Sequence, residues 1–154
     1  MEAPKGLSEN LQTREPREPG VYTLHADATL LLDEIRQGTC KDSIIHLLVD
    51  PETCQISVKG TLPFDGSSRK ERLNWISSCA KKEGPSLFVF RTDMRSNSPE
   101  WALLVWAPKS SISVAERAFY FTALSWLSSS FVDTNLPREF YVTEEAEMPV
   151  FKWT

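Results

Sequence analysis

The chain has 154 residues, a net charge of −4 and an isoelectric point near 5.3. Hydrophobic residues make up 41% of it and charged residues 25%, which suits one domain with a substantial core and excludes a chain that is disordered throughout. The acidic balance argues against a nucleic-acid-binding module, since such modules carry a basic surplus that neutralises phosphates, and no apolar run reaches the roughly 18 residues of a membrane span.

The first 19 residues combine three prolines with seven charged side chains. Such a segment buries too little surface to offset the entropy of ordering it, so we predict a flexible arm at residues 1–19. The arm also lacks the apolar region of a secretory signal. The three cysteines (Cys40, Cys54 and Cys79) are widely spaced and odd in number, which argues against a disulfide framework or a zinc site and favours a reducing, cytoplasmic location.

The first predicted elements are a helix and a hairpin. The helix runs from about Asp27, which can cap it, to Gln37, and Gly38 ends it. The apolar run at residues 44–50 predicts a buried strand, residues 50–53 a turn, and the alternation over residues 55–60 a second strand that completes the hairpin.

The middle of the chain is predicted to contain a second helix followed by two further strands. Residues 61–66 are expected to form a loop, and residues 67–82 a helix whose Leu73, Ile76 and Ala80 lie on one stripe. Residues 86–92 and 101–106 read as apolar strands on either side of a polar loop at residues 94–99. Trp101 and Trp106 are predicted to meet different environments, because five residues separate them on a strand of period two.

The longest helix is predicted at residues 113–131, and a short last strand at residues 140–143. Helical spacing of 100° per residue puts four side chains of the helix on one polar stripe, namely Ser113, Glu116, Arg117 and Tyr120. The same spacing points Val114, Ala118 and Phe121 away from this stripe, toward an expected buried face. The element order predicts an α+β fold in which helices flank one mixed sheet.

No known catalytic pattern is present. The chain lacks a phosphate-binding glycine loop, a nucleophile elbow and a metal-binding histidine pair. Of the two histidines, His46 lies within a predicted strand and is interpreted as structural, while His25 precedes the first helix. We therefore predict no catalytic residue, no metal site and no cofactor.

Residues 87–109 carry a resemblance to a known family. Phe90-Arg91-Thr92-Asp93, Glu100-Trp101 and Trp106-Ala107-Pro108 occur in the order found in the actin-depolymerising factor homology (ADF-H) domain. The segment is most similar to the twinfilin branch. The resemblance covers residues 20–148, so we expect an ADF-H-like domain there, with residues 149–154 as a tail or linker fragment.

The resemblance implies a non-enzymatic, cytoplasmic and cytoskeletal protein that binds actin. The family inserts the start of its long helix into the cleft of an actin monomer, and twinfilins sequester ADP-actin and slow its nucleotide exchange. The matching residues of this chain are Gly20, Val21, Tyr22, Lys109, Ser113, Val114, Ala115, Glu116, Arg117, Ala118 and Tyr120. A second family surface, which binds filaments, matches Arg95, Ser96, Glu144 and Glu145 more loosely. Phosphoinositides are a further ligand class that the resemblance raises, and we expect the chain to be a monomer.

The chain departs from the family in its basic residues. The long helix of the family begins with basic-x-basic, and the matching positions here are Ala115 and Arg117. Lysines near the end of that helix are replaced by Ser128 and Ser129, so attraction to the acidic surface of actin should be weaker. Three alternatives stay open: a coactosin- or glia-maturation-factor-like binder of filaments or of the branching complex, a scaffold that no longer binds actin, and a small enzyme with an unrecognised site.

Overall fold

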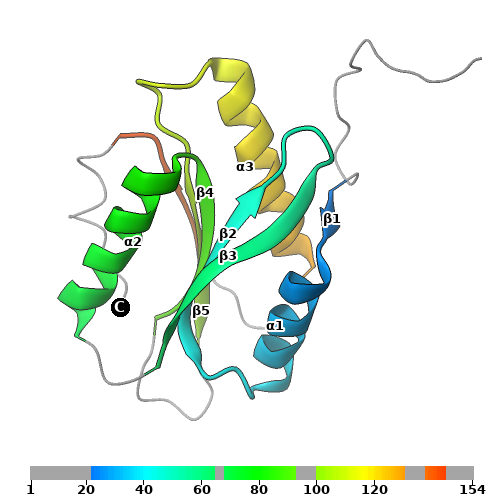
Figure 1. Cartoon of the computed structure of the whole chain (residues 1–154), viewed down its shortest axis with the longest axis vertical. Coiled ribbons are helices and arrows are strands. Elements are labelled where there is room, and N and C mark those ends of the chain that lie inside the picture. Colours follow the sequence, from blue (N-terminus) through cyan, green and yellow to red (C-terminus); the bar gives the residue numbers. More distant parts are fainter. Residues whose placement is uncertain (1–21, 65–67, 93–99, 131–137, 145–154) are drawn as a thin grey trace, which may run out of the picture.

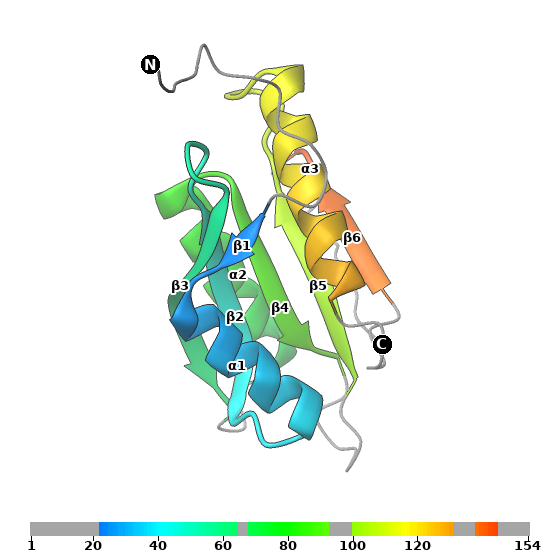
Figure 2. The same ribbon diagram turned by 90° about the vertical axis from the view of Figure 1, so that its right-hand side faces the viewer.

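The computed structural model describes residues 22–64, 68–92, 100–130 and 138–144 (Figure 1). These residues form one sheet with a single helix on one side and two helices on the other (Figures 1 and 2). The elements in chain order are β1 (Thr23–Leu24), α1 (Ala26–Gln37), β2 (Asp42–Val49), β3 (Gln55–Pro63), α2 (Arg69–Glu83), β4 (Ser86–Arg91), β5 (Trp101–Trp106), α3 (Val114–Ser129) and β6 (Arg138–Val142). The predicted arm at residues 1–19, the loop at residues 94–99 and the tail at residues 149–154 lie outside the described residues. Neither α1, α2 nor α3 is long and apolar enough to cross a membrane.

The sheet is mixed, as predicted. Its six strands lie in the order β1-β3-β2-β4-β5-β6. The four inner strands pair antiparallel, whereas β1 runs parallel to β3 and β6 runs parallel to β5. The predicted hairpin of β2 and β3 and the antiparallel pair of β4 and β5 are therefore confirmed. The predicted longest helix is confirmed as well, since α3 has 16 residues and α2 has 15.

Alternate residues of the inner strands enter two separate cores, because successive side chains of a strand point to opposite faces. The α1/α3 side contains Leu87, Val89, Trp101, Leu103 and Val105 among its buried residues. The α2 side contains Phe88, Phe90, Ala102, Leu104 and Trp106. Trp101 and Trp106 thus lie on opposite sides of the sheet, as their spacing predicts.

The start of α1 differs from the prediction. The N-cap is His25 rather than Asp27, and its Nδ1 accepts a hydrogen bond from the backbone N–H of Asp27 at 3.2 Å. The carboxylate of Asp27 instead accepts the backbone N–H of Val58 at 3.3 Å, so it joins the helix to β3. Gly38 ends the helix with φ 76°, a conformation that glycine adopts without steric cost, as predicted.

Two further differences concern the edge of the sheet. β1 was not predicted, because a two-residue strand has no period of its own and is held by neighbours such as Cys54, whose carbonyl accepts the Thr23 N–H. Residues 61–63 were predicted as loop but continue β3, since they pair with β2 from Ile45 to Asp42. In both cases pairing with a neighbouring strand outweighs the local sequence signal.

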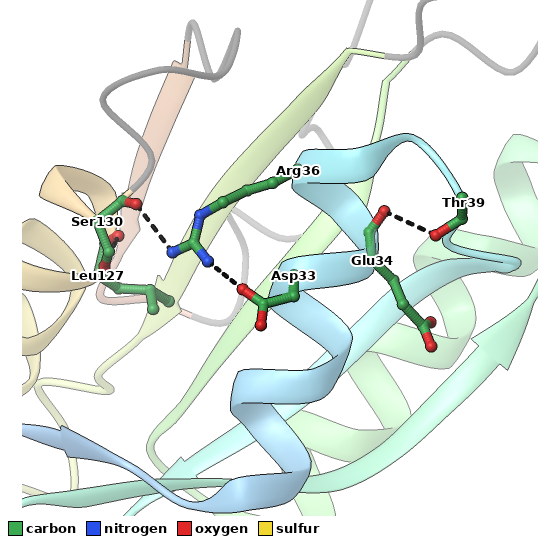
Figure 3. A network of polar contacts seen from close by, with 6 residues as sticks. All are labelled: Asp33, Glu34, Arg36, Thr39, Leu127 and Ser130. Atoms are coloured by element: carbon green, nitrogen blue, oxygen red, sulfur yellow. Dashed lines mark hydrogen bonds and ion pairs between the residues drawn. The ribbon is translucent and has the colours of Figure 1, made fainter.

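α1 and α3 are joined at their C-terminal ends by Arg36. Its guanidinium donates to the carboxylate of Asp33 at 2.6 Å and to the carbonyl of Ser130 at 2.9 Å (Figure 3). α3 has no basic residue in its own last turn, and the last carbonyls of a helix lack partners within the helix. A cation from α1 therefore satisfies one carbonyl at the end of α3 and fixes the two helices relative to each other.

Candidate functional site

The segment that leads into α3 is held against the end of the sheet. The backbone N–H of Ala107 donates to the carbonyl of Val142, and that of Lys109 donates to the carbonyl of Thr143, each at 2.9 Å. The chain then turns, and the backbone N–H of Ile112 donates to the carbonyl of Pro108 at 3.2 Å. These bonds make the start of α3 a fixed feature at one end of the molecule (Figures 1 and 2).

The first turn of α3 is closed by a capping box. The hydroxyl of Ser113 accepts the backbone N–H of Glu116 at 3.1 Å, and the carboxylate of Glu116 accepts the backbone N–H of Ser113 at 2.9 Å. Both groups bond backbone N–H donors that have no partner within the helix. The negative charge of Glu116 is also stabilised by the positive, N-terminal end of the helix dipole. Ser113 and Glu116 therefore have a structural role here in addition to their exposure.

The predicted orientation of α3 is wrong in its first half. Val114 and Ala118 were expected on the buried face, but both are exposed, and the side chain of Val114 has 72% of its surface accessible. The helix instead turns the line of Arg117 and Tyr120 toward the sheet, and this line continues into Leu124. Apolar residues surround the helix, and the orientation that buries the larger side chains removes more apolar surface from water than one that buries valine and alanine.

Arg117 is half-buried and locally bonded, which corrects its predicted exposed position. Its guanidinium donates to the carbonyl of Ile112 at 3.2 Å, so it links the first turn of α3 to the loop before it. Ala115 beside it is exposed. The side chains exposed at the start of α3 are therefore the apolar Val114, Ala115 and Ala118 and the two capping residues, Ser113 and Glu116.

Tyr22 joins the predicted N-terminal contact segment to α3. Its hydroxyl donates to the carbonyl of Phe119 at 2.7 Å, and its ring lies 5.5 Å from that of Phe119 and 6.0 Å from that of Trp126. Tyr22 itself is buried, with 4% of its surface accessible. It therefore supports the helix from inside, while Gly20 and Val21 lie outside the described residues.

Tyr120 of α3 lies near two acidic side chains. Its ring is half-buried and packs edge-on against that of Phe119 at 5.1 Å. Burial raises the pKa of its hydroxyl, and the negative charges of Glu116 and Asp50 raise that pKa further. The turn that contains Asp50 therefore lies close enough to α3 for its charge to reach the site. Sequence spacing did not indicate this, since the two elements are about 70 residues apart.

The two predicted surfaces meet in one ion pair. The ammonium of Lys109 lies 2.8 Å from the carboxylate of Glu144, and both side chains are about half-exposed. Lys109 was assigned to the monomer surface and Glu144 to the filament surface, so the two surfaces adjoin at the end of β6. Arg95, Ser96 and Glu145 lie outside the described residues.

No group of His, Cys, Asp and Glu among the described residues could hold a metal ion. His46 is buried, its Nε2 lies 2.9 Å from the hydroxyl of Ser86, and its ring stacks on that of Phe88 at 4.6 Å. Burial lowers the pKa of His46 to about 4, which keeps the imidazole neutral at neutral pH. These contacts agree with its predicted structural role.

Comparison with solved structures identifies the fold. A twinfilin designated Eh is 19% identical, with a TM-score of 0.65 over 83% of this chain and 91% of its own. Actin depolymerization factor 2 of Plasmodium berghei is 11% identical (TM-score 0.64; 84% and 94% of the two chains), and cofilin of Streptomyces griseoflavus is 16% identical (TM-score 0.58; 82% and 89%). No protein-family model and no curated protein sequence matches the chain. The structural matches show that the chain has the ADF-H fold.

Proposed function

We propose that this chain is an actin-binding module that takes up ADP-actin monomers through the start of α3 and the segment before β1, and so regulates filament turnover. The support comes from two sides. The fold is shared with proteins whose names refer to actin, among them an actin depolymerization factor and a yeast actin-binding protein. In this fold the sequence resemblance assigns actin binding to the start of the long helix.

The exposure of Val114 is the observation that carries the proposal. A valine in the first turn of a helix that is 72% accessible contributes little to the core, because it removes little apolar surface from water. The capping box and the bonded loop before it hold this turn in place, so little conformational entropy is lost when a partner covers it. An apolar projection with small neighbours at Ala115 and Ala118 suits insertion into an apolar cleft.

Monomer binding is favoured over filament binding by the charges of α3. The last turn of α3 contains no basic residue, and Ser128 and Ser129 stand where the family has lysines. The acidic residue assigned to the filament surface, Glu144, is paired with Lys109. Within the described residues, the last turn of α3 therefore offers an acidic filament no cation of its own, which weakens the attraction between them.

The test is to measure the wild-type chain against both forms of actin. Titration of fluorescently labelled ADP-actin monomers should show saturable binding, and the chain should slow exchange of the bound nucleotide. Sedimentation of filaments should leave most of the chain in the supernatant. Co-sedimentation without monomer binding would favour a coactosin-like function, and no binding to either form would favour the scaffold alternative.

A further inference from the structure

α2 presents a basic surface on the side of the sheet that faces away from α1 and α3 (Figure 1). The helix contains five basic and two acidic residues in a chain whose net charge is −4. We call its exposed side chains the α2 outer face: Arg69, Lys70, Glu71, Asn74, Ser78, Lys81 and Lys82. This face is unrelated to the site at the start of α3.

The stability of the helix accounts for only half of these cations. Lys81 and Lys82 lie in the last turn, where the helix dipole favours positive charge. Arg69 and Lys70 lie in the first turn, where the dipole disfavours it. Arg72, which follows in the same turn, is buried. Burial lowers the pKa of its guanidinium, and the positive charge of Arg69 lowers that pKa further. The basic residues at the start of α2 therefore gain nothing from the helix dipole, so the dipole does not account for their presence.

The cations lie in a line with neutral hydrogen-bonding groups between them. Lys70 and Lys81 are eleven positions apart on the same side of the helix, which corresponds to about 17 Å along its axis. Asn74 and Ser78 occupy the interval. The large exposed apolar side chains of the described residues (Leu30, Phe64, Val114 and Tyr141) all lie outside α2.

We propose that the α2 outer face binds an extended acidic segment of another protein. An extended chain advances about 3.3 Å per residue, so two groups of carboxylates about five residues apart would match the two basic ends of α2. Asn74 and Ser78 would bond the peptide backbone between them. Because this face and the start of α3 lie on opposite sides of the sheet, one domain could hold actin and an acidic partner together.

The chemistry of the face favours a peptide over a lipid surface. Helices that lie on membranes insert apolar side chains between the lipids, and the α2 outer face has none. Binding of nucleic acid is disfavoured by the net charge of −4 of the whole chain. Both remain outcomes that the experiment can detect.

The experiment measures fluorescence anisotropy of two labelled peptides of equal composition with the full chain at low ionic strength. One peptide, Glu-Glu-Ser-Gly-Ser-Glu-Glu, separates its acidic pairs; the other, Ser-Glu-Glu-Glu-Glu-Gly-Ser, joins them. The separated peptide should bind more tightly. The double variant Lys70→Gln/Lys81→Gln should weaken that binding about fivefold, which corresponds to about 1 kcal/mol for the two surface ion pairs together.

The matched control is Arg36→Gln/Lys41→Gln, which changes net charge equally at two exposed basic residues outside α2 and should change the affinity less than twofold. Circular dichroism establishes that both double variants are folded. The proposal is overturned if neither peptide binds, if the joined peptide binds as well, or if the control variant loses as much affinity. Binding to anionic vesicles or single-stranded RNA without binding to the separated peptide overturns it too.

Discussion

The two sides of the sheet differ in size, charge and stabilising chemistry. Among the residues that the structure describes, the core on the α1/α3 side has 18 buried residues and that on the α2 side has 9, of which Phe88, Phe90 and Trp106 are aromatic. The larger core positions two helices, one of which presents Val114 to solvent. The smaller core relies on few large side chains and on a buried imidazole at His46. The side proposed to bind actin therefore has the larger apolar core, whereas the other side contains the buried titratable imidazole.

The outward charges of the two sides differ as well. The α2 side exposes four basic residues and one acidic residue on its helix. The region around the start of α3 contains Asp50 and Glu116, and its cations Lys109 and Arg117 are engaged with Glu144 and with a backbone carbonyl. The two sides should therefore respond differently to pH and to single substitutions.

Acidification should weaken the α2 side first, through His46. The unfolded chain takes up a proton on this imidazole below about pH 6.5, whereas the folded protein does so only near pH 4. The stability that the neutral imidazole contributes is therefore complete above pH 6.5 and is lost as the pH falls toward 4. The loss should amount to about 3 kcal/mol in the free energy of unfolding, at 1.36 kcal/mol per pKa unit.

Denaturant unfolding of wild type and His46→Gln between pH 7 and pH 4 measures this effect. The other titrating groups are common to both proteins, so the difference between their free energies of unfolding isolates the imidazole. The free energy of unfolding of wild type minus that of His46→Gln should fall by most of about 3 kcal/mol between pH 7 and pH 4. Two parallel curves would show that His46 is not the acid-sensitive group.

On the α1/α3 side, Tyr22→Phe should destabilise the fold by about 1 kcal/mol. The change removes the hydroxyl that donates to the carbonyl of Phe119 at 2.7 Å and leaves a buried acceptor without it. Thermal unfolding at neutral pH gives the measurement. Tyr141→Phe is the control, because its hydroxyl bonds an exposed carboxylate of Glu139 and its loss should have a smaller effect. Equal losses from both variants would contradict a specific tie between the β1 segment and α3.

Arg36→Gln should have the smallest effect, about 0.5 kcal/mol, because the pairs of Arg36 are partly exposed. The variant removes the link between α1 and the last carbonyls of α3 (Figure 3). Hydrogen exchange of the last turn of α3 should speed up while exchange in α2 stays unchanged. Faster exchange in both helices would mean that the two sides of the sheet are not independent.

The sequence predicted the fold well because its signals are local and periodic. The strands at residues 86–91 and 101–106 alternate between two cores, and this alternation placed Trp101 and Trp106 on opposite sides. Gly38 ended α1 as expected from its conformational freedom. β1 escaped prediction because it is held by β3 and by Cys54, both of which lie some 30 residues further along the chain.

The candidate site was predicted less well, since its properties depend on how α3 turns on the sheet. Spacing correctly grouped Ser113, Glu116, Arg117 and Tyr120 on one arc, but could not decide whether that arc faces water. The core decided it, because Leu124 and Leu127 lie on the same arc one or two turns later. Capping explains why Ser113 and Glu116 occur on this arc, because they bond the N–H groups at the open end of the helix.

The most direct test of the central claim compares two exposed apolar residues. Val114→Asp should lower affinity for ADP-actin monomers about tenfold or more, because it places a charge in the proposed apolar contact, and aspartate in a first helical turn should leave stability unchanged. Leu30→Asp alters a side chain of α1 that is 62% exposed and should leave the affinity unchanged. Titration of labelled monomers with wild type and both variants gives the comparison. Wild-type affinity in the Val114→Asp variant, with its fold intact, would contradict the account.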